Sequence, residues 1–242
     1  MNGSTGTIEG GYLIAIEGID GAGKTTLATA LHAALREHGI QAVLTKEPTK
    51  GPFGQRIRES AATGRLQPDE ELELLIADRR EHVELLLQPS LATGKVVILD
   101  RYYLSNIAYQ GSEGLDMQMI LQRNEEFAPV PNLVFLLDIA PALGLERIAS
   151  RGDVANHFEN EKNLSACRSY FQSLASGAWS GLEGTQFVTI DASQSPEDVL
   201  AIALRSFVKA VCNSVADRLG ATPGGADEVL RLLGGALVGE PA

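Results

Sequence analysis

One short segment limits the folds open to this chain more than any other. Residues 18–25 read Gly-Ile-Asp-Gly-Ala-Gly-Lys-Thr, which has the spacing Gly-x-x-x-x-Gly-Lys-Thr. The apolar run from Tyr12 to Ile16 predicts a buried strand before this segment, and a helical pattern begins after it at Thr26. A strand, a glycine-rich loop and a helix in this order are the context in which the motif binds phosphate. The chain is therefore expected to adopt an α/β fold that carries a phosphate-binding loop.

The residue types in the loop indicate what it binds. Its glycines let backbone N–H groups converge on phosphate oxygens, and the N-terminus of the following helix adds a partial positive charge. In this motif the lysine reaches the β and γ phosphates and the threonine hydroxyl ligates Mg²⁺. The predicted nucleotide-binding residues are Gly18, Gly21, Ala22, Gly23, Lys24, Thr25 and Thr26. A nucleoside triphosphate is the expected ligand, and the competing interpretation is a glycine-rich turn without one.

Strand and helix patterns alternate along the chain, which predicts parallel strands joined by right-handed crossovers. The predicted strands are Leu13 to Glu17, Gln41 to Thr45, Lys95 to Leu99, Leu133 to Leu137 and Gln186 to Ile190. All are rich in Val, Ile or Leu, as expected where helices cover both faces of a sheet. Ligands bind at the carboxyl ends of such strands, where Asp100 and Asp138 lie. Asp100 is the predicted magnesium ligand with Thr25, and Asp138 is interpreted as a turn or helix-capping acid.

Composition narrows the class of protein and its partners. With 242 residues and 44% apolar side chains, the chain is long enough for one full α/β core. A net charge of −11 argues against nucleic acid or an anionic membrane as a partner. The two cysteines, Cys167 and Cys212, have no metal-type spacing and suit a reducing cytoplasm. No apolar segment is long enough to span a membrane, so a cytoplasmic protein is expected.

Residues 11–219 are expected to form the domain, preceded by a flexible N-terminus, residues 1–10. Its last helix has Ser195 as a cap and Pro196 in the first turn, and it runs to Leu219, where Gly220 ends it. Residues 220–242 predict a linker and a short apolar helix. That extension either docks on the protein or a second subunit, or is a functionally silent tail.

Two helical segments have unusual faces. Between Glu70 and Leu87 an arginine, Arg79, falls on the apolar face, where it needs an anionic or polar partner unless it snorkels to the helix edge. After Asp100, a helical segment places four polar and aromatic side chains on one face: Tyr102, Ser105, Asn106 and Tyr109. That face suits a flat heterocycle, and the alternative is a half-buried surface helix.

A pair of arginines, Arg147 and Arg151, lies four residues apart on one helical face and is followed by Gly152. The polar residues 153–160 are expected to form a mobile cover. Arginines on a cover over a phosphate loop would stabilise a phosphoryl group in transfer. The alternative is an ordinary solvated helix end, which also favours basic residues.

Several motifs together resemble the thymidylate kinases over about residues 10 to 208. They are Glu17 to Thr26, Glu47-Pro48, Ala77-Asp78-Arg79 with His82, Asp100-Arg101-Tyr102 with Ser105, Ala108-Tyr109-Gln110, and Arg147 through Gly152 to Glu159. The resemblance implies a P-loop kinase fold, with a five-stranded parallel sheet flanked by helices and a short lid. It also implies transfer of the γ-phosphoryl group of ATP to dTMP, with Mg²⁺, by a homodimer.

The resemblance also assigns roles to residues. Lys24 and Thr25 serve ATP and magnesium, and Arg101, with Arg58 as a second contact, grips the acceptor phosphate. The residues implied around the acceptor are Asp20, Glu47, Arg58, Leu75, Arg79, Arg101, Ser105, Asn106 and Tyr109. The implied catalytic residues are Lys24, Arg101, Asp20, Arg147 and Arg151. In the family the catalytic basic residue comes either from the phosphate loop or from the lid; because Ala22 occupies the loop position, the resemblance implies the two lid arginines.

This sequence departs from the family pattern at the acceptor side. Leu75 stands where the family commonly has a phenylalanine that stacks on thymine, and residues 47–54 replace the usual Glu-Pro-Gly-Gly-Thr turn. These departures favour a relaxed deoxynucleoside monophosphate kinase as the enzyme alternative. The alternative from another class is a non-catalytic nucleotide-binding switch. A switch would not need Arg58, Arg79 and Arg101 opposite the phosphate loop.

Overall fold

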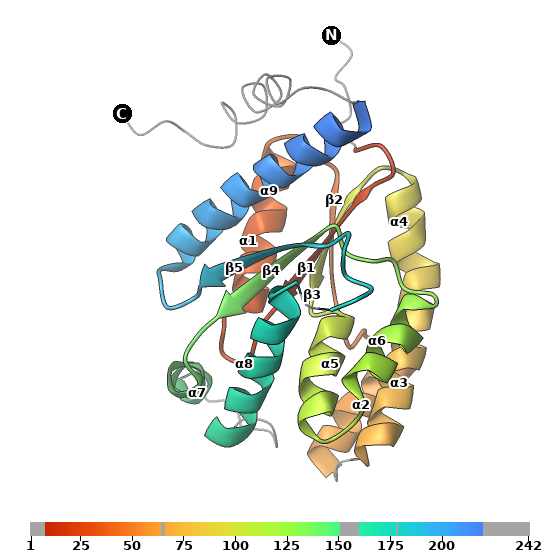
Figure 1. The fold of residues 1–242 in the computed structure, drawn as a ribbon, viewed down its shortest axis with the longest axis vertical. Helices are drawn as coiled ribbons and strands as arrows, with labels where there is room; N and C mark the ends of the chain where they lie inside the picture. The colour runs from red at the N-terminus through yellow and green to blue at the C-terminus, as the bar shows by residue number, and fades with distance from the viewer. Residues whose placement is uncertain (1–7, 64–65, 151–159, 178, 220–242) are drawn as a thin grey trace.

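The computed structural model describes residues 8–63, 66–150, 160–177 and 179–219, and a parallel sheet lies at their centre (Figure 1). Its strands are β1 (Tyr12–Glu17), β2 (Ala42–Lys46), β3 (Val96–Asp100), β4 (Leu133–Asp138) and β5 (Gln186–Asp191). They lie in the order β2-β3-β1-β4-β5, and every neighbouring pair is parallel. The predicted fold class is confirmed, and each predicted strand end lies within one residue of the observed end.

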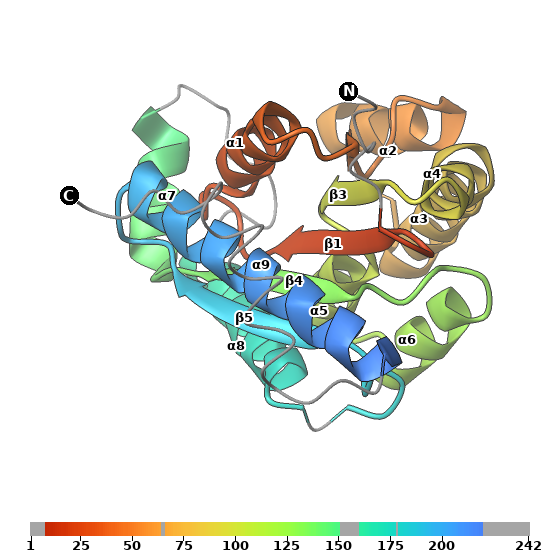
Figure 2. The same ribbon diagram turned by 90° about the horizontal axis from the view of Figure 1, so that it is seen from above.

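Helices cover both faces of the sheet. In chain order they are α1 (Lys24–Glu37), α2 (Pro52–Thr63), α3 (Pro68–His82), the π-helix η1 (Val83–Leu87), α4 (Gln88–Ala92), α5 (Tyr103–Ser112), α6 (Met117–Glu125), α7 (Pro141–Ser150), α8 (Glu161–Ala175) and α9 (Pro196–Leu219). Helices α1 and α9 pack against each other on one face, whereas α5, α6 and α8 lie on the opposite face (Figure 2). Figure 1 shows α7 beyond the carboxyl end of β4.

The burial of the strands explains why the phosphate loop is held firmly. Every residue of β1 is buried, because β3 and β4 flank this strand and helices cover both of its faces. The edge strands β2 and β5 are only partly buried. In the register of the sheet Ile16 pairs with Asp100, so β1 and β3 end side by side. The loop after β1 therefore starts next to the turn that follows Asp100.

The cap predicted for the last helix is present in the structure. The Ser195 hydroxyl accepts a hydrogen bond from the Asp198 backbone N–H (3.1 Å), which confirms this residue as the cap of α9. Residues 1–7 and 220–242 lie outside the described residues, and the flexible start, the linker and the short helix predicted there lie outside them too. Within the predicted flexible N-terminus, Ile8 donates a backbone hydrogen bond to Gly94 (2.8 Å). Among the helices of the described residues, none has the length and apolar character that crossing a bilayer requires.

Candidate active site

Two glycines of the phosphate loop between β1 and α1, Gly18 and Gly21, lie where a side chain would displace neighbouring backbone. Gly18 and Gly21 have φ angles of 140° and 80°, which side chains disfavour. A Cβ atom at Gly21 would lie 2.2 Å from the Gly144 carbonyl oxygen, and one at Gly18 would lie 2.5 Å from the Leu137 carbonyl oxygen. The loop backbone therefore packs directly against α7 and the end of β4.

Gly144 makes the same contact from the side of α7. A Cβ atom there would lie 2.7 Å from the backbone oxygen of Asp20. Two backbones thus approach each other at Gly21 and Gly144 with no side chain between them. Arg147 follows Gly144 by three residues, so the loop fixes where this arginine stands.

Lys24, the first residue of α1, is buried at the base of the loop. Its Nζ donates to the carbonyl oxygens of Gly18 (2.9 Å) and Ile19 (2.7 Å). Burial, helped by the nearby Arg101 charge, lowers the pKa of Lys24 to about 7. An anionic phosphate next to this amine would favour its charged form, so the amine is ready to gain a proton when phosphate binds.

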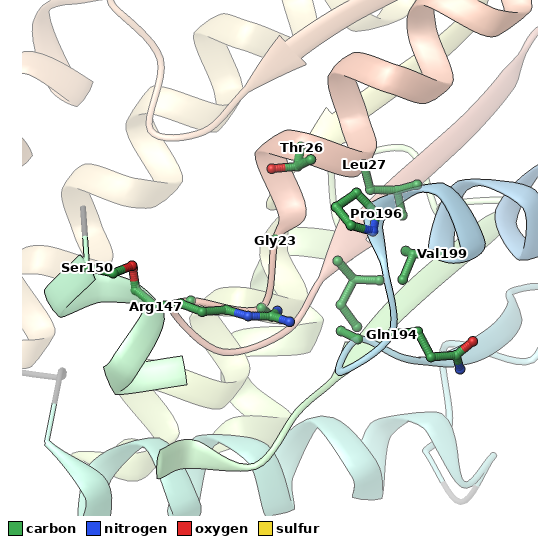
Figure 3. A pocket seen from close by; sticks show the side chains of 12 residues that line it. Gly23, Thr26, Leu27, Arg147, Ser150, Gln194, Pro196 and Val199 are labelled. Carbon is green, nitrogen blue, oxygen red and sulfur yellow. The ribbon is translucent and has the colours of Figure 1, made fainter. Parts of the chain in front are cut away.

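A cavity of about 340 Å³, which we call the phosphate-loop cavity, opens on one side of the loop (Figure 3). It is lined by Gly21, Ala22, Gly23, Thr26, Leu27, Leu137, Arg147, Ser150, Ala192, Gln194, Pro196 and Val199. In Figure 3 the Arg147 side chain extends from α7 toward Gly23, and Pro196 and Val199 of α9 stand across from it. The predicted lid partner Arg151 lies outside the described residues, and so does the predicted cover, residues 153–160, except for Asn160, which is the N-cap residue of α8.

The carboxylate of Asp100 lies beside Thr25, as the predicted magnesium site requires. Its Oδ2 accepts hydrogen bonds from the Thr25 hydroxyl (2.5 Å) and from Lys46 Nζ (3.2 Å). Its Oδ1 is buried and has no hydrogen-bond partner. No cluster of three or more His, Cys, Asp or Glu side chains suited to a metal is present in the described part of the chain. A hydroxyl and one carboxylate fit Mg²⁺, which takes few protein ligands and otherwise phosphate and water.

A second cavity, of about 200 Å³, lies on the other side of the loop, and we call it the Arg79 cavity. It is lined by Asp20, Glu47, Pro48, Ile57, Glu71, Leu75, Arg79, Arg101, Tyr102, Ser105, Asn106, Tyr109 and Gln110. With the exception of Arg58, all of the residues that the family resemblance placed around an acceptor line this cavity. Arg58 instead donates to the Pro48 carbonyl oxygen (3.1 Å) and lines a neighbouring cavity with Thr25 and Asp100.

Arg79 is almost completely buried, with 1% of its surface exposed, so the snorkelling alternative is wrong. Its Nε and Nη2 donate to Glu47 (2.9 and 2.5 Å), and its Nη1 donates to Asn106 (2.7 Å) and Asn124 (2.5 Å). The guanidinium also lies 5.2 Å from the centre of the Tyr102 ring. The prediction of an anionic or polar partner is therefore confirmed, and four donor bonds fix the orientation of this arginine.

Glu47 is held from a second side by His82. The His82 ring lies 2.9 Å from Glu47 Oε1 through Nδ1 and 2.8 Å from the Thr45 hydroxyl through Nε2. Burial alone would raise the pKa of Glu47, but Arg79 and His82 outweigh it and lower that pKa. The sequence analysis noted His82 only as part of a motif and assigned it no role. Its position one turn after Arg79 was the available signal.

The turn after β2 is fixed in the same way by α3. Asp78 accepts hydrogen bonds from the Thr49 backbone N–H (2.7 Å) and hydroxyl (2.6 Å). Its neighbour on α3, Arg79, holds Glu47 at the start of the turn. The first half of the altered turn is thus held by α3 at Glu47 and at Thr49.

Arg101 and Asp20 form an ion pair at the boundary of the Arg79 cavity. Arg101 has a φ angle of 73°, a strained value for a residue with a side chain, and Tyr109 donates to Asp20 (3.1 Å) from the other side. Burial alone would raise the pKa of Asp20, but Arg101 and Lys24 together lower it. The pair keeps both charges in place at the end of β3 and in the loop.

Leu75 lines the Arg79 cavity and is 7% exposed, so an aliphatic side chain stands at the position where the family commonly has phenylalanine. Phe53, the candidate replacement, is 37% exposed and is not part of the cavity lining. The aromatic rings that line the cavity are those of Tyr102 and Tyr109.

Asp138 differs from the turn or capping acid that the sequence suggested. Both of its oxygens accept from Arg168 of α8 (2.7 and 2.8 Å), which lowers the pKa of this carboxyl. The side chain therefore ties α8 to the end of β4. No local sequence pattern indicates this ion pair, because the two residues are 30 positions apart.

A parallel sheet in this strand order, a glycine loop with a lysine at its base, and cavities on both sides of that loop define a P-loop phosphotransferase. Comparisons with known proteins make the assignment specific. Residues 16–202 match the family model for thymidylate kinase. The chain therefore belongs to the thymidylate kinase family.

Named relatives agree along most of the chain. It is 51% identical over 213 residues to a thymidylate kinase of Xanthomonas campestris pv. campestris (strain B100), covering 88% of this chain and 89% of that protein. It is 52% identical over 210 residues to one of Xanthomonas oryzae pv. oryzae (strain PXO99A), covering 87% of each. It is 51% identical over 192 residues to one of Xylella fastidiosa (strain 9a5c), covering 79% of this chain and 88% of that protein.

Proposed function

We propose that the protein transfers the γ-phosphoryl group of ATP to dTMP and releases ADP and dTDP. The observation that carries this proposal is the way the two cavities meet. Asp20 lines the Arg79 cavity, and the next residue, Gly21, lines the phosphate-loop cavity. Two nucleotides bound in these cavities would bring their phosphates together at the loop, as direct transfer requires.

The donor is proposed to occupy the phosphate-loop cavity. Glycine N–H groups would bind its phosphates, and Lys24 would leave the Gly18 and Ile19 carbonyls to follow the transferred group. The apolar side chains of Leu27, Pro196 and Val199 provide a surface for the adenine ring. Arg147, and Arg151 in the proposed lid, would approach the phosphates from α7 and its continuation, compensating for the absence of a basic residue at Ala22.

The acceptor is proposed to occupy the Arg79 cavity. Arg101, with Arg58 at the neighbouring cavity, would bind the acceptor phosphate, and Asp20 and Tyr109 would contact the sugar. Arg79, Ser105 and Asn106 would reach the base, with Leu75 against its face. Glu47 orients Arg79 through the hydrogen bonds described above.

We further propose Mg²⁺ as the cofactor, held by Thr25 and by Asp100, whose Oδ1 has no other partner. The ion would neutralise charge on the donor phosphates. Lys46, which already contacts Asp100, would have to yield part of that contact. We also propose a homodimer, on the family resemblance, and a cytoplasmic location, which suits two buried free cysteines.

A coupled assay for ADP release with dTMP, dUMP, dCMP, dGMP and UMP as acceptors tests the proposal. We expect dTMP to give the highest kcat/KM and omission of Mg²⁺ to abolish turnover. Slow ATP hydrolysis that no acceptor accelerates would contradict the proposal and favour a nucleotide-binding switch.

A further inference from the structure

Glu17, the last residue of β1, is a completely buried carboxyl group that lines neither the phosphate-loop cavity nor the Arg79 cavity. Its Oε1 accepts hydrogen bonds from the backbone N–H groups of Tyr102 (2.8 Å) and Ser105 (3.3 Å). Its Oε2 accepts one from the Ser105 hydroxyl (2.6 Å). The side chain therefore acts within the protein, on the segment that begins α5.

These contacts place Glu17 where a helix cap would be. Tyr102 is the N-cap residue of α5, and its own side chain makes no cap hydrogen bond. Ser105 is the third residue of the helix, whose N–H a cap side chain ordinarily satisfies. The Ser105 N–H is shared between the Tyr102 carbonyl oxygen (3.0 Å) and Glu17 Oε1, so Glu17 adds an acceptor from 88 residues away, at the helix end where an acidic group is favoured.

The capped segment carries the contacts proposed for the acceptor. Arg101 precedes it, Ser105 also accepts a hydrogen bond from Arg101 Nη1 (3.3 Å), and Ser105, Asn106 and Tyr109 line the Arg79 cavity. On its other side Glu17 is followed at once by Gly18, the first residue of the phosphate loop. One side chain thus joins the two halves of the site.

We propose that Glu17 is a positioning residue, which sets the start of α5, and with it Arg101 and Ser105, at a fixed distance from the phosphate loop. The hydrogen bonds from Glu17 to the start of α5 stand on geometry alone, whereas their effect on kinetics rests on the proposed function. Burial raises the pKa of this carboxyl to about 7, while its hydrogen bond with Ser105 and the Arg101 charge oppose that shift. Because Glu17 is buried and lines neither cavity, its carboxyl group acts through the length of its side chain and through its two acceptor oxygens.

Glu17 connects strand β1 to the turn at Tyr102, and of these two segments the strand is held more firmly. Strand β1 pairs with β3 on one side and with β4 on the other, and all of its residues are buried. The turn at Tyr102 has its backbone N–H bonded to Glu17 and lies next to Arg101 with its strained φ angle. A shorter side chain at position 17 should therefore displace the start of α5 and leave the loop where it is.

Two substitutions at position 17 separate the effect of side-chain length from the effect of charge. Glu17→Asp keeps the carboxyl group but withdraws it by one carbon–carbon bond, about 1.5 Å. Glu17→Gln keeps the reach and an acceptor oxygen for both backbone N–H groups and removes the charge. For Glu17→Asp we expect the Kd and KM of dTMP to rise at least about tenfold, with the KM of ATP changed less than about threefold. Glu17→Gln, the matched control, should stay within about threefold of wild type for both substrates.

Crystal structures of the variants test the geometry without any activity. The distance between Ser105 and Gly18 should change in Glu17→Asp and stay unchanged in Glu17→Gln. Equal kinetic constants and an unchanged distance in a folded Glu17→Asp protein would overturn the proposal, and so would equal losses for dTMP and ATP. A wild-type protein that fails to phosphorylate dTMP would overturn the proposed function instead, while the Ser105 distance would still decide the role of Glu17.

Hydrogen exchange on the wild-type protein provides a test that needs no variant. Amides at the start of an uncapped helix exchange quickly, because they have no acceptor in the protein. The Tyr102 amide has Glu17 as its acceptor, so it should exchange slowly. Rapid exchange at Tyr102 would overturn the proposal even if Glu17→Asp did not fold.

Discussion

The two cavities lie on opposite sides of one loop, but different kinds of residue line them. The Arg79 cavity is lined largely by charged and polar side chains, among which Arg79 bonds Glu47 and Asn106. Residues behind the lining, Glu17, His82 and Asn124, accept or share hydrogen bonds with the lining residues. The phosphate-loop cavity is made of glycine backbone and apolar side chains, with Arg147 as its charged group in the described residues. The Arg79 cavity is suited to recognise the shape and polarity of one substrate, whereas the phosphate-loop cavity is suited to bind the phosphates that many nucleotides share.

This difference also predicts how each side responds to change. In the Arg79 cavity a lost partner leaves a buried charge unpaired, which costs about 3–5 kcal/mol. In the phosphate-loop cavity the backbone supplies most contacts, so substitutions act through Lys24 or through the distance between the loop and α7. The predictions below use this contrast.

The largest expected effect is on the donor side. Lys24→Ala should lower kcat by at least about 10²–10³-fold, because it removes the amine that is to follow the transferred phosphoryl group. The hydrogen bonds of its Nζ go to two backbone carbonyls, which water can bind in its place, so the fold should survive. Turnover and the thermal midpoint should be measured on the same preparation. Near-normal turnover in a well-folded variant would refute the assignment of the phosphate-loop cavity to the donor.

On the acceptor side, Leu75→Phe should sharpen base selectivity. An aromatic ring stacked on a base contributes about 1–3 kcal/mol, and Leu75 lines the cavity without supplying one. The ratio of kcat/KM for dTMP over dGMP should therefore be larger in the variant than in wild type. Leu75→Met, which changes the side chain without adding a ring, is the control. A wild-type ratio already in the thousands would show that another group has the stacking role.

Gly144→Ala tests whether the contact between α7 and the loop places Arg147. Alanine favours helix over glycine by about 1 kcal/mol, so the helix itself should gain stability. The added Cβ would lie 2.7 Å from the Asp20 oxygen, and α7 has to move away. We expect kcat to fall about 10–100-fold with the KM of dTMP unchanged. Gly184→Ala, where the Cβ meets nothing within 4 Å, is the control, and equal kcat values in the two variants would contradict the account.

A smaller effect concerns the protonation of Lys24. The pKa of Lys24 is lowered to about 7 from 10.5, so between these pH values the unfolded chain holds a proton that the folded protein lacks. This group's contribution to stability therefore rises with pH across that window. Bound ATP should restore the charged amine, so binding at pH 8 should take up about one proton. Calorimetry in buffers of different ionisation enthalpy measures the uptake, and Lys24→Arg, always charged, should abolish it. Equal uptake in both proteins would contradict this assignment.

Much of the fold could be predicted from the sequence because its signals are local. The strands are short apolar runs, and the phosphate loop has fixed spacing, so both were found within one residue. Arg79 could be singled out because it falls on an apolar helix face, and Leu75 because it stands where the resembled family commonly has phenylalanine. The Asn124 contact to Arg79, the Arg168 pair of Asp138 and the cap role of Glu17 could not be predicted. Each depends on residues brought together by tertiary packing, over separations of 30 to 88 positions.

The central claim is that the two cavities bind different nucleotides, and isothermal titration of each nucleotide alone tests it most directly. Arg79→Gln should weaken dTMP binding at least about tenfold and leave the Kd of ATP within about twofold, since Arg79 lines the Arg79 cavity and not the phosphate-loop cavity. Arg147→Gln should do the reverse, because Arg147 lines the phosphate-loop cavity and not the Arg79 cavity. If Arg79→Gln folded normally and bound dTMP as tightly as wild type, the assignment of the acceptor to the Arg79 cavity would be wrong.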